Sequence, residues 1–470
     1  MEREKFGSRL GFLFVSAGCA VGLGNIWRFP WLVGEYGGGL FVLIFLVFIA
    51  LLGLPIMTSE FAIGRASGQS IGKAFNVLQP EGAKWHIFGY FGIAGNYMLM
   101  FFYTTVVGWV CVYFIRALNG SFMGKTPDEV VDIFVFDTIL APGTLVGWML
   151  FVVLFSFAVC AMGVQSGVEK VTKFMMSGFF ILLIVMMIRA LTLPQMEGVE
   201  TTAIDGLKFF FIPDLAAVEA HGLPTIMFRA MGQAFFSLSL GMGSMLIFGS
   251  YCSKNKSLPG ESRNVIGLDL VASIGSGLII FPACFAFGIE PGKGAGLLFM
   301  AMPNIFNAMP FGQLFASVFF LFLIFATITT VIAVFENIIA FWMDVKGWTR
   351  KKSVGVNLII VLAGAFPTAL GFNVWDPFFA PMLAWLGDGM QMIDLFDFII
   401  SQNILPLGSA IFVLFCALNK GWGYKNFVEE VNIGDGMKWP TKFKAYYTYV
   451  IPALIAVIFI LGYVDWFVGI

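Results

Sequence analysis

The stretch Gly18-Cys-Ala-Val-Gly-Leu-Gly-Asn-Ile-Trp-Arg-Phe-Pro30 lies inside the first long apolar segment, where a membrane helix would normally run without interruption. It places Gly22 and Gly24 two residues apart and follows them with an amide, Asn25, and a charge, Arg28. Each glycine weakens a helix by about 1 kcal/mol, and a charge at the centre of a bilayer costs roughly 3 kcal/mol on insertion scales. Irregular backbone is tolerated in a membrane only where it is buried in protein or lines a cavity. The stretch therefore predicts a helix that opens around a bound polar species.

The composition is that of a protein embedded in a membrane. Hydrophobic residues make up 59% of the 470 residues and charged residues only 12%, whereas soluble domains carry about 25% charged residues. The formal net charge of −1 argues against a nucleic-acid partner, so we expect a lipid bilayer and a small molecule as partners. The six cysteines form no C-x-x-C motif and both histidines lie at segment boundaries, which argues against a His-based metal site.

Eleven apolar segments are long enough to cross the hydrocarbon core, which needs about 20 residues. They predict an all-α polytopic membrane protein that forms a single integral membrane domain over residues 1–470. The segments lie near 10–34, 40–64, 87–116, 143–161, 174–193, 227–252, 264–288, 312–343, 354–371, 393–418 and 445–467.

The basic residues predict the orientation of these segments. If the N-terminus is cytoplasmic, most of the 27 Lys and Arg residues fall on the cytoplasmic side, as the positive-inside rule requires. The sequence thus predicts a multi-pass protein of the cell (inner) membrane with a cytoplasmic N-terminus. Because the number of segments is odd, the C-terminus is expected outside.

Two of the segments carry the same interruption. Gly22-Leu-Gly24 breaks the first segment, and Gly241-Met-Gly243 breaks the sixth. A single glycine pair is explained by close helix packing in membranes. Two pairs in corresponding helices, each beside polar side chains, instead indicate a transporter binding site.

Few ionisable residues lie at membrane depth. Asp269 and Arg28 are expected to be functional, because the broken helices can reach them. Glu60 and Glu336 are explained by ion pairing or hydrogen bonding inside the bundle. Tyr103, in the middle of the third segment, needs a partner for its phenol.

The eighth segment offers a cluster of oxygen atoms. Ala326, Thr329 and Thr330 are spaced i, i+3 and i+4 and share one helix face. Threonines in helices usually bond back to carbonyls of the preceding turn. Beside an opened helix with free carbonyls at Gly18 and Val21, however, they resemble the oxygen-rich sites that hard cations prefer.

No catalytic signature is present. The pair Gly22-x-Gly24 is not a nucleotide loop, because Trp27 stands where the third glycine should be. The chain also lacks H-E-x-x-H and a Walker lysine. An enzyme is therefore not expected.

Several motifs together resemble those of the neurotransmitter:sodium symporter family, in its prokaryotic, eleven-helix form. They are the run from Arg9-Leu-Gly to Pro30, Glu35-x-Gly-Gly-Gly39, Gly53-Leu-Pro-x-Met-x-x-Glu60, Phe235 to Gly241 and Ala326 to Thr330. The resemblance implies the leucine-transporter fold, with two inverted five-helix repeats in which helices 1 and 6 are broken. These repeats would occupy residues 10–193 and 227–418, followed by an additional helix at 445–467.

The resemblance also assigns roles to residues of this chain. It implies a first sodium site formed by the Ala20 carbonyl, Asn25, Ser237 and Asp269. It implies a second formed by the carbonyls of Gly18, Val21 and Ala326 and the hydroxyls of Thr329 and Thr330. The implied outer gate pair is Arg28 with Asp397, and Phe236 is its aromatic lid. The implied inner gate pair is Arg3 with Asp344. The implied substrate-binding residues are Ala20, Gly22, Gly24, Leu99, Tyr103, Phe236, Ser237, Ser239, Met242, Val331 and Val334.

Two departures from the family pattern refine the expected cargo. Monoamine members carry an aspartate where Gly22 stands, so the substrate here should bring its own carboxylate. Chloride-dependent members carry a tyrosine and an asparagine where Phe45 and Asp269 stand, so chloride is not expected. The resemblance thus predicts a symporter that uses two Na⁺ to import a hydrophobic or aromatic amino acid by alternating access. The alternative is a non-transporting amino-acid-binding membrane sensor on the same fold; the oligomeric state is left open.

Overall fold

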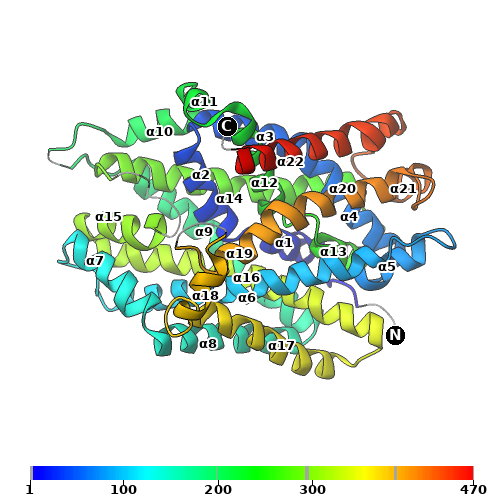
Figure 1. Cartoon of the computed structure of the whole chain (residues 1–470), viewed down its shortest axis with the longest axis horizontal. Helices are drawn as coiled ribbons and strands as arrows, with labels where there is room; N and C mark the ends of the chain where they lie inside the picture. The colour runs from blue at the N-terminus through cyan, green and yellow to red at the C-terminus, as the bar shows by residue number, and fades with distance from the viewer. Residues whose placement is uncertain (1–3, 197, 290, 292–295, 386–388, 469–470) are drawn as a thin grey trace.

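The computed structural model describes residues 4–196, 198–289, 291, 296–385 and 389–468. Its long helices run side by side along the longest axis of the molecule (Figure 1). Within the described residues, extended pairing is limited to two isolated bridges, Gly38 with Pro213 and Lys256 with Asp435. The predicted all-α class is therefore confirmed.

Nine helical segments of the described chain are long and apolar enough to cross a membrane. Each coincides with a segment predicted from hydropathy. They are α3–η2–α4 (Gly39–Ser67), α6 (Ile87–Leu118), α8 (Pro142–Ala161), η4–α9 (Val164–Leu191), α14 (Leu258–Ala286), α16 (Gly312–Lys346), α17 (Arg350–Leu370), α19–η6–α20 (Met392–Ala417) and η7–η8–α22 (Thr441–Val464).

The other two predicted segments are the interrupted ones. In the first, α1 (Arg9–Ala20) is followed by η1 and α2 (Gly24–Glu35), and the two parts are bent by 52°. In the sixth, residues 238–243 separate α12 (Leu223–Ser237) from α13 (Ser244–Tyr251). Both interruptions fall at the glycine pairs that predict them.

The fifth span begins earlier than hydropathy predicts, at Val164 instead of residue 174. The extra turns carry Glu169 and Lys173, whose charges depress the hydropathy. Glu169 is buried because it accepts hydrogen bonds from the Gly7 amide at 2.7 Å and the Ser8 hydroxyl at 2.8 Å. The N-terminal segment thus provides the partners that let this polar part of the helix enter the bundle.

Short helices cap the two ends of the bundle. They are α5 (Ile71–Leu78), α7 (Pro127–Phe134), η3 (Val135–Ile139), α10 (Ala203–Phe211), α11 (Ala216–His221), η5 (Leu297–Ala301), α15 (Met302–Ala308), α18 (Asp376–Leu383) and α21 (Tyr424–Val431).

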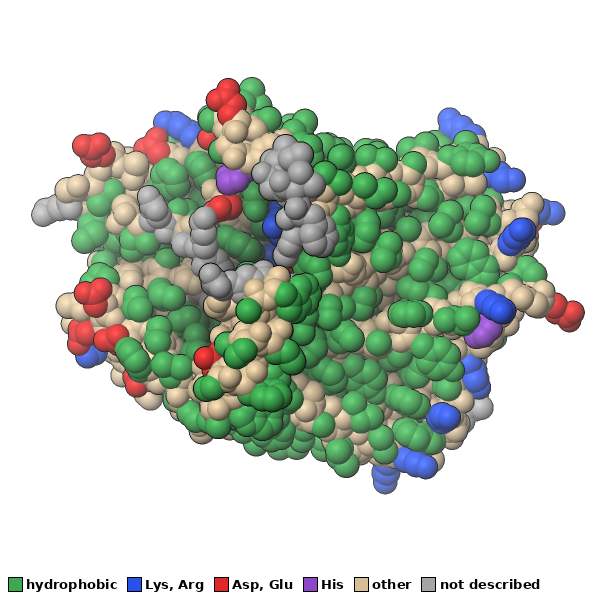
Figure 2. Space-filling model, in the orientation of Figure 1, with side chains coloured by type: hydrophobic (Ala, Val, Ile, Leu, Met, Phe, Trp, Pro, Cys, Tyr) green, Lys and Arg blue, Asp and Glu red, His purple; other side chains and the backbone are tan. Residues whose placement is uncertain are grey.

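Charges are sorted between the ends. Figure 2 shows apolar side chains over the middle of the molecule and most Lys and Arg side chains at the end that carries the N-terminus in Figure 1. Acidic side chains gather at the opposite end, near α7 and α10. We call these the basic end and the acidic end.

Packing brings the two breaks together at the centre. The helix α1 packs against α16, α9 and α14, and η1 packs against α12 and α14. The start of α1 is fixed by Ser8, whose hydroxyl caps the helix by accepting the Gly11 amide at 3.0 Å. Its end is fixed by Val21, whose extended conformation (φ −71°, ψ 110°) stops the helix.

Candidate ion and substrate site at the helix breaks

The break in the first helix leaves two carbonyl groups without their usual helical partners. In a regular helix the Gly18 carbonyl would accept from the Gly22 amide, and the Val21 carbonyl from the Asn25 amide. Instead, the Gly22 amide donates to Asn25 Oδ1 at 3.0 Å. The Asn25 amide donates to the Gly22 carbonyl at 3.1 Å. Both freed carbonyls lie in a buried region, where unpaired polar atoms are costly.

The first oxygen cluster forms where these carbonyls meet α16. The Thr330 hydroxyl lies 3.1 Å from Gly18 O, 3.1 Å from Val21 O and 3.3 Å from Ala326 O. The Thr329 hydroxyl lies 2.8 Å from Ala326 O. A hydroxyl has a single hydrogen, so Thr330 cannot satisfy three carbonyls. This surplus of acceptors suits a cation, and it unites all five residues of the predicted second sodium site.

The other oxygen cluster surrounds the Asn25 side chain. Its amide nitrogen lies 2.7 Å from Asp269 Oδ1, 2.8 Å from Ser273 Oγ and 3.1 Å from Ser237 Oγ. It also lies 3.3 Å from Asp269 O. The amide has two hydrogens and each serine hydroxyl has one, which makes four hydrogens for five oxygens when both carboxylate oxygens of Asp269 are counted.

Among the described residues, no basic side chain pairs with the carboxylate in this second cluster. Asp269 is fully buried, and both of its carboxylate oxygens lie within 3.0 Å of the Ser237 hydroxyl. The ion pairs of the described chain do not include Asp269. An uncompensated buried carboxylate is strongly destabilising. Asn25, Ser237 and Asp269, three of the four residues predicted for the first sodium site, therefore form a cluster that suits a small cation. Ala20, the fourth, is the last residue of α1.

Glycines let the surrounding side chains close onto the break. A Cβ on Gly22 would lie 2.5 Å from Tyr103 Oη and 2.7 Å from Thr330 Oγ1. A Cβ on Gly24 would lie 2.8 Å from Phe236 Cδ1. The phenol of Tyr103 accepts the Leu23 amide at 3.1 Å, which gives it the partner that the sequence requires.

Towards the acidic end, the predicted outer gate pair is formed. Arg28 Nη1 lies 3.3 Å from Asp397 Oδ1 and donates to the Ser401 hydroxyl at 2.7 Å. Ser401 in turn donates to Asp397 Oδ1 at 2.6 Å. The Arg28 guanidinium also lies 4.7 Å from the centre of the Phe236 ring, so the aromatic lid and the ion pair form one layer.

This layer borders a cavity of about 330 Å³. Of the predicted substrate residues, Tyr103 and Phe236 line it, along with Arg28 and Asp397. The other nine predicted substrate residues do not line this cavity and are less than one-tenth exposed: Ala20, Gly22, Gly24, Leu99, Ser237, Ser239, Met242, Val331 and Val334. The Ser239 hydroxyl donates to Cys19 O at 2.9 Å, which directs it towards the first break.

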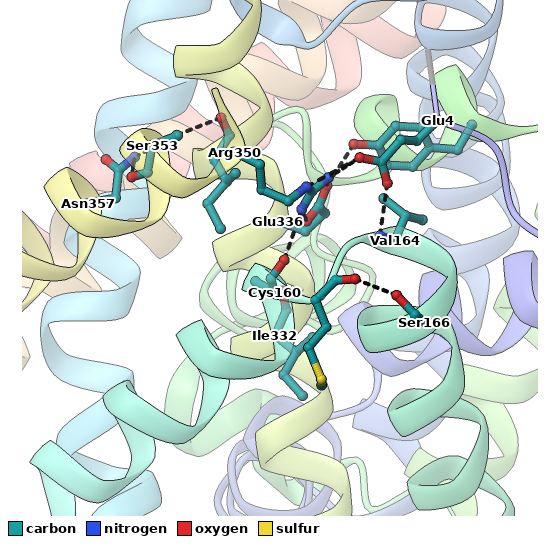
Figure 3. A network of polar contacts seen from close by, with 12 residues as sticks. Glu4, Cys160, Val164, Ser166, Ile332, Glu336, Arg350, Ser353 and Asn357 are labelled. Atoms are coloured by element: carbon teal, nitrogen blue, oxygen red, sulfur yellow. Dashed lines mark hydrogen bonds and ion pairs between the residues drawn. The ribbon is translucent and has the colours of Figure 1, made fainter. Parts of the chain in front are cut away.

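At the basic end, the predicted inner gate pair is described only in part. Arg3 lies outside the described residues, and Asp344 accepts the Ser70 amide at 2.6 Å. The described N-terminal segment is held by Glu4 instead, which accepts from Arg350 at 3.0 Å and from the Val164 amide at 2.9 Å (Figure 3).

Arg350 joins this contact to the interior of the bundle. Its guanidinium bonds the buried Glu336 at 2.7 Å and Cys160 O at 3.0 Å (Figure 3). Glu336 also accepts from the Tyr251 hydroxyl at 2.8 Å. The expectation that Glu336 serves ion pairing inside the bundle agrees with these contacts.

Three polar residues of the site were not singled out from the sequence as ligands or gate residues. Gln233 donates to Gly24 O at 2.7 Å, Ser273 contacts Asn25, and Ser401 contacts Arg28. Each lies four residues from a predicted site residue on its own helix: Ser237, Asp269 and Asp397 respectively. Because residues spaced i, i+4 share a helix face, this spacing is the signal that could have found them.

Two broken helices that meet around buried oxygen clusters define a secondary membrane transporter, whose sites lie where interrupted helices face each other. The chain belongs to the Sodium:neurotransmitter symporter family, whose model matches residues 3–133 and 128–467. The family resemblance seen in the sequence is thereby confirmed. The protein is a sodium-dependent transporter and not an enzyme.

Known relatives cover almost the whole chain. The uncharacterized sodium-dependent transporter YhdH of Bacillus subtilis (strain 168) is 32% identical over 418 residues, which cover 88% of this chain and 87% of YhdH. An uncharacterized sodium-dependent transporter of Haemophilus influenzae is 32% identical over 471 residues, 98% of each chain. Among solved structures, the crystal structure of MhsT in complex with L-phenylalanine has 33% identity and a TM-score of 0.86. That match covers 98% of this chain and 100% of the MhsT chain.

Replacing Gly22 with alanine is expected to destabilise the protein by about 1–3 kcal/mol, the usual cost of overpacking, because the new Cβ would collide with Tyr103 and Thr330. Gly232→Ala is the matched control, since its Cβ would meet only Ser401 O, at 3.9 Å, and alanine favours the helix. Thermal unfolding in detergent measures both variants. Equal midpoints would contradict the close packing at Gly22.

Proposed function

We propose that the protein is a symporter that couples sodium entry to the import of a hydrophobic or aromatic amino acid, without chloride. The observation that carries this proposal is the surplus of buried oxygens over hydrogens at the two clusters beside the broken helices. Sodium dependence follows from the family. Two cations at these clusters would supply the positive charge that the freed carbonyls and Asp269 lack.

Each cluster has a distinct composition, which suggests how each acts. At the first sodium site, the Ala20 carbonyl, Asn25, Ser237 and Asp269 would bind one cation, and the substrate's carboxylate would complete the shell. The predicted second sodium site, which is the oxygen cluster beside α16, consists of carbonyls and hydroxyls and is therefore neutral. A cation bound there would hold α1 against α16, and its departure would release the contact.

The lack of space around Gly22 favours a substrate that carries its own carboxylate. Even a Cβ at this position would collide with Tyr103 and Thr330, so the aspartate of monoamine transporters does not fit. The carboxylate would instead meet the amides near Gly24 and the Tyr103 hydroxyl. Leu99, Met242, Val331 and Val334, with Phe236 and Ser239, would form an apolar pocket for its side chain. The L-phenylalanine in the MhsT complex supports a cargo of this class.

Chloride independence rests on Phe45 and Asp269. Phe45 is fully buried and its ring lies 4.8 Å from that of Phe29, so it offers no hydroxyl to an anion. Asp269 would place a fixed negative charge beside the sodium ion. Attraction between charges is strong in a low-dielectric interior, so a mobile anion becomes unnecessary.

The sorted charges support an orientation with the basic end, and the N-terminus, in the cytoplasm of a cell whose inner membrane holds the protein. The C-terminus would lie outside. Arg28, Asp397 and Phe236 would then close the outer side. Arg3 with Asp344, and Glu4 with Arg350, would close the inner side. Residues 10–193 and 227–418 would form the two inverted repeats that rock against each other, with 445–467 outside them.

Sodium coupling supplies enough energy for accumulation. Moving one positive charge across 100 mV yields about 2.3 kcal/mol, so two sodium ions yield about 4.6 kcal/mol from the potential alone. Every 1.4 kcal/mol corresponds to a factor of ten. The potential alone would therefore sustain about a two-thousandfold accumulation of a neutral amino acid.

Uptake of radiolabelled phenylalanine, leucine and tryptophan into proteoliposomes is expected to require sodium outside. Replacement of sodium by potassium or choline should reduce uptake at least tenfold, whereas replacement of chloride by gluconate should leave it unchanged. Sodium-independent uptake would contradict the coupling. Saturable binding without accumulation would favour the membrane sensor instead.

The Asp269→Asn variant is expected to need at least tenfold more sodium for half-maximal uptake, or to become responsive to chloride, because the fixed charge at the first sodium site is gone. Sodium titrations with chloride and with gluconate measure both effects. Wild-type sodium affinity in both salts would rule out the role assigned to Asp269.

The double variant Thr329→Ala, Thr330→Ala is expected to raise the half-activating sodium concentration at least tenfold, since it removes both hydroxyls of the second site. Thr327→Ala is the control, because the hydrogen bonds that its hydroxyl makes in the described part of the chain stay within α16, to Leu323 O at 2.8 Å and Ile324 O at 3.4 Å. An unshifted sodium titration of the double variant would count against the second site.

A further inference from the structure

A second large cavity lies away from the helix breaks, on the side of the bundle formed by α6, α8, α9 and α16. It is a groove of about 550 Å³. None of the described residues that line it carries a charge, a hydroxyl or an amide side chain. An amino acid, with its two charges, would find no partner there, so the groove belongs to a different ligand.

The groove opens outwards at the level of the membrane-spanning helices. Phe151 and Phe155 of α8, which form part of its rim, are 48% and 37% exposed. Cys111, Met175 and Ile328 line it from three other helices and are at most 6% exposed, so they form its floor. Exposed apolar side chains along a spanning helix face hydrocarbon, not water.

A glycine keeps the groove open. Gly147 lies within the 20-residue helix α8 and lines the groove, and a Cβ added to it would meet no atom within 4 Å. Gly108 on α6 is different, because its Cβ would lie 3.1 Å from Met149 N of α8, so helix packing explains it. A glycine inside a helix costs about 1 kcal/mol relative to alanine. Gly143 on the same helix is equally open, so what distinguishes Gly147 is that its open space belongs to the groove.

We propose that this groove binds an acyl chain of a membrane lipid. A cavity of about 150 Å³ with apolar walls is enough to bind benzene, and this groove is several times larger. A chain enters it from the surrounding hydrocarbon and gains contacts with the aromatic rim and the buried floor. The headgroup stays outside, since the lining offers it no polar partner. This proposal does not depend on the identity of the transported substrate.

Two floor residues of the groove are sequence neighbours of residues that pack at the first oxygen cluster. Its floor residues Met175 and Ile328 directly precede Met176 and Thr329 in the sequence. The Thr329 hydroxyl contacts Met176 Sδ at 3.7 Å, so these two residues join α9 to α16 behind the groove. A bound chain would therefore support the layer against which Thr329 packs.

Native mass spectrometry of the delipidated protein, titrated with dioleoylphosphatidylglycerol, tests the site. Gly147→Leu fills the groove, whereas Gly143→Leu adds the same side chain one turn away on α8, at a position that is equally open and outside the groove. The affinity for one lipid should fall at least tenfold in Gly147→Leu and stay at the wild-type value in Gly143→Leu. Equal lipid binding by the two variants would overturn the proposal, as would loss of a dimer at unchanged lipid binding, which would assign the groove to a second copy.

A fluorescence measurement keeps the test independent of how well Gly147→Leu folds. Trp148 also lines the groove. The protein is placed in vesicles of phosphatidylcholine with brominated chains, which quench tryptophan fluorescence. The part of the quenching that is present in the wild type and absent from Trp148→Phe measures contact between a lipid chain and Trp148. We expect a Trp148-dependent component in the wild type and in Gly143→Leu. Its absence from the wild type would show that no chain enters the groove.

Discussion

A backbone carbonyl inside a membrane must be given a partner, because no water is available there to take the place of a missing helical hydrogen bond. The break at residues 21–23 removes the helical partners of Gly18 and Val21, and the surrounding structure responds to that loss. Thr330 approaches both carbonyls, and Asn25 takes up the Gly22 amide. At both clusters, hydrogen-bond acceptors still outnumber the hydrogens that the protein can donate to them. In our account, sodium ions make up the difference, which ties the local conformation of one helix to the ion that drives transport.

The second break obeys the same constraint but satisfies its backbone with protein groups. Glu60 accepts the Gly241 amide at 2.6 Å, and Asn96 donates to Met242 O at 3.0 Å. A Cβ on Gly241 would lie 2.3 Å from Leu405 O, so the opened segment packs directly on the backbone of α20. That helix continues from the segment that carries Asp397 and Ser401. The second break and the Arg28–Asp397 pair are therefore connected through one continuous span.

Hydropathy and glycine spacing predict the eleven segments and both breaks, because these features depend on local composition. The family motifs then predict all five residues that meet at the cluster beside α16, and they predict Asn25, Ser237 and Asp269 at the other cluster. The sequence does not predict Gln233, Ser273 and Ser401, because a single glutamine or serine on an apolar helix resembles an ordinary packing residue until its neighbours are known. The contact between Glu4 and Arg350 joins residues far apart in the sequence, and no periodicity indicates it. The early start of the fifth span depends likewise on Ser8 and Gly7, which satisfy Glu169 from a distant part of the chain.

Equilibrium binding of radioactive sodium to the purified protein tests the central claim most directly. The measurement counts the ions bound per chain at saturating sodium and phenylalanine, in the absence of chloride. If the surplus of oxygens at the two clusters is balanced by sodium, two ions are bound per chain, and removal of the amino acid weakens the binding of one of them. A count of one ion or none would contradict the account.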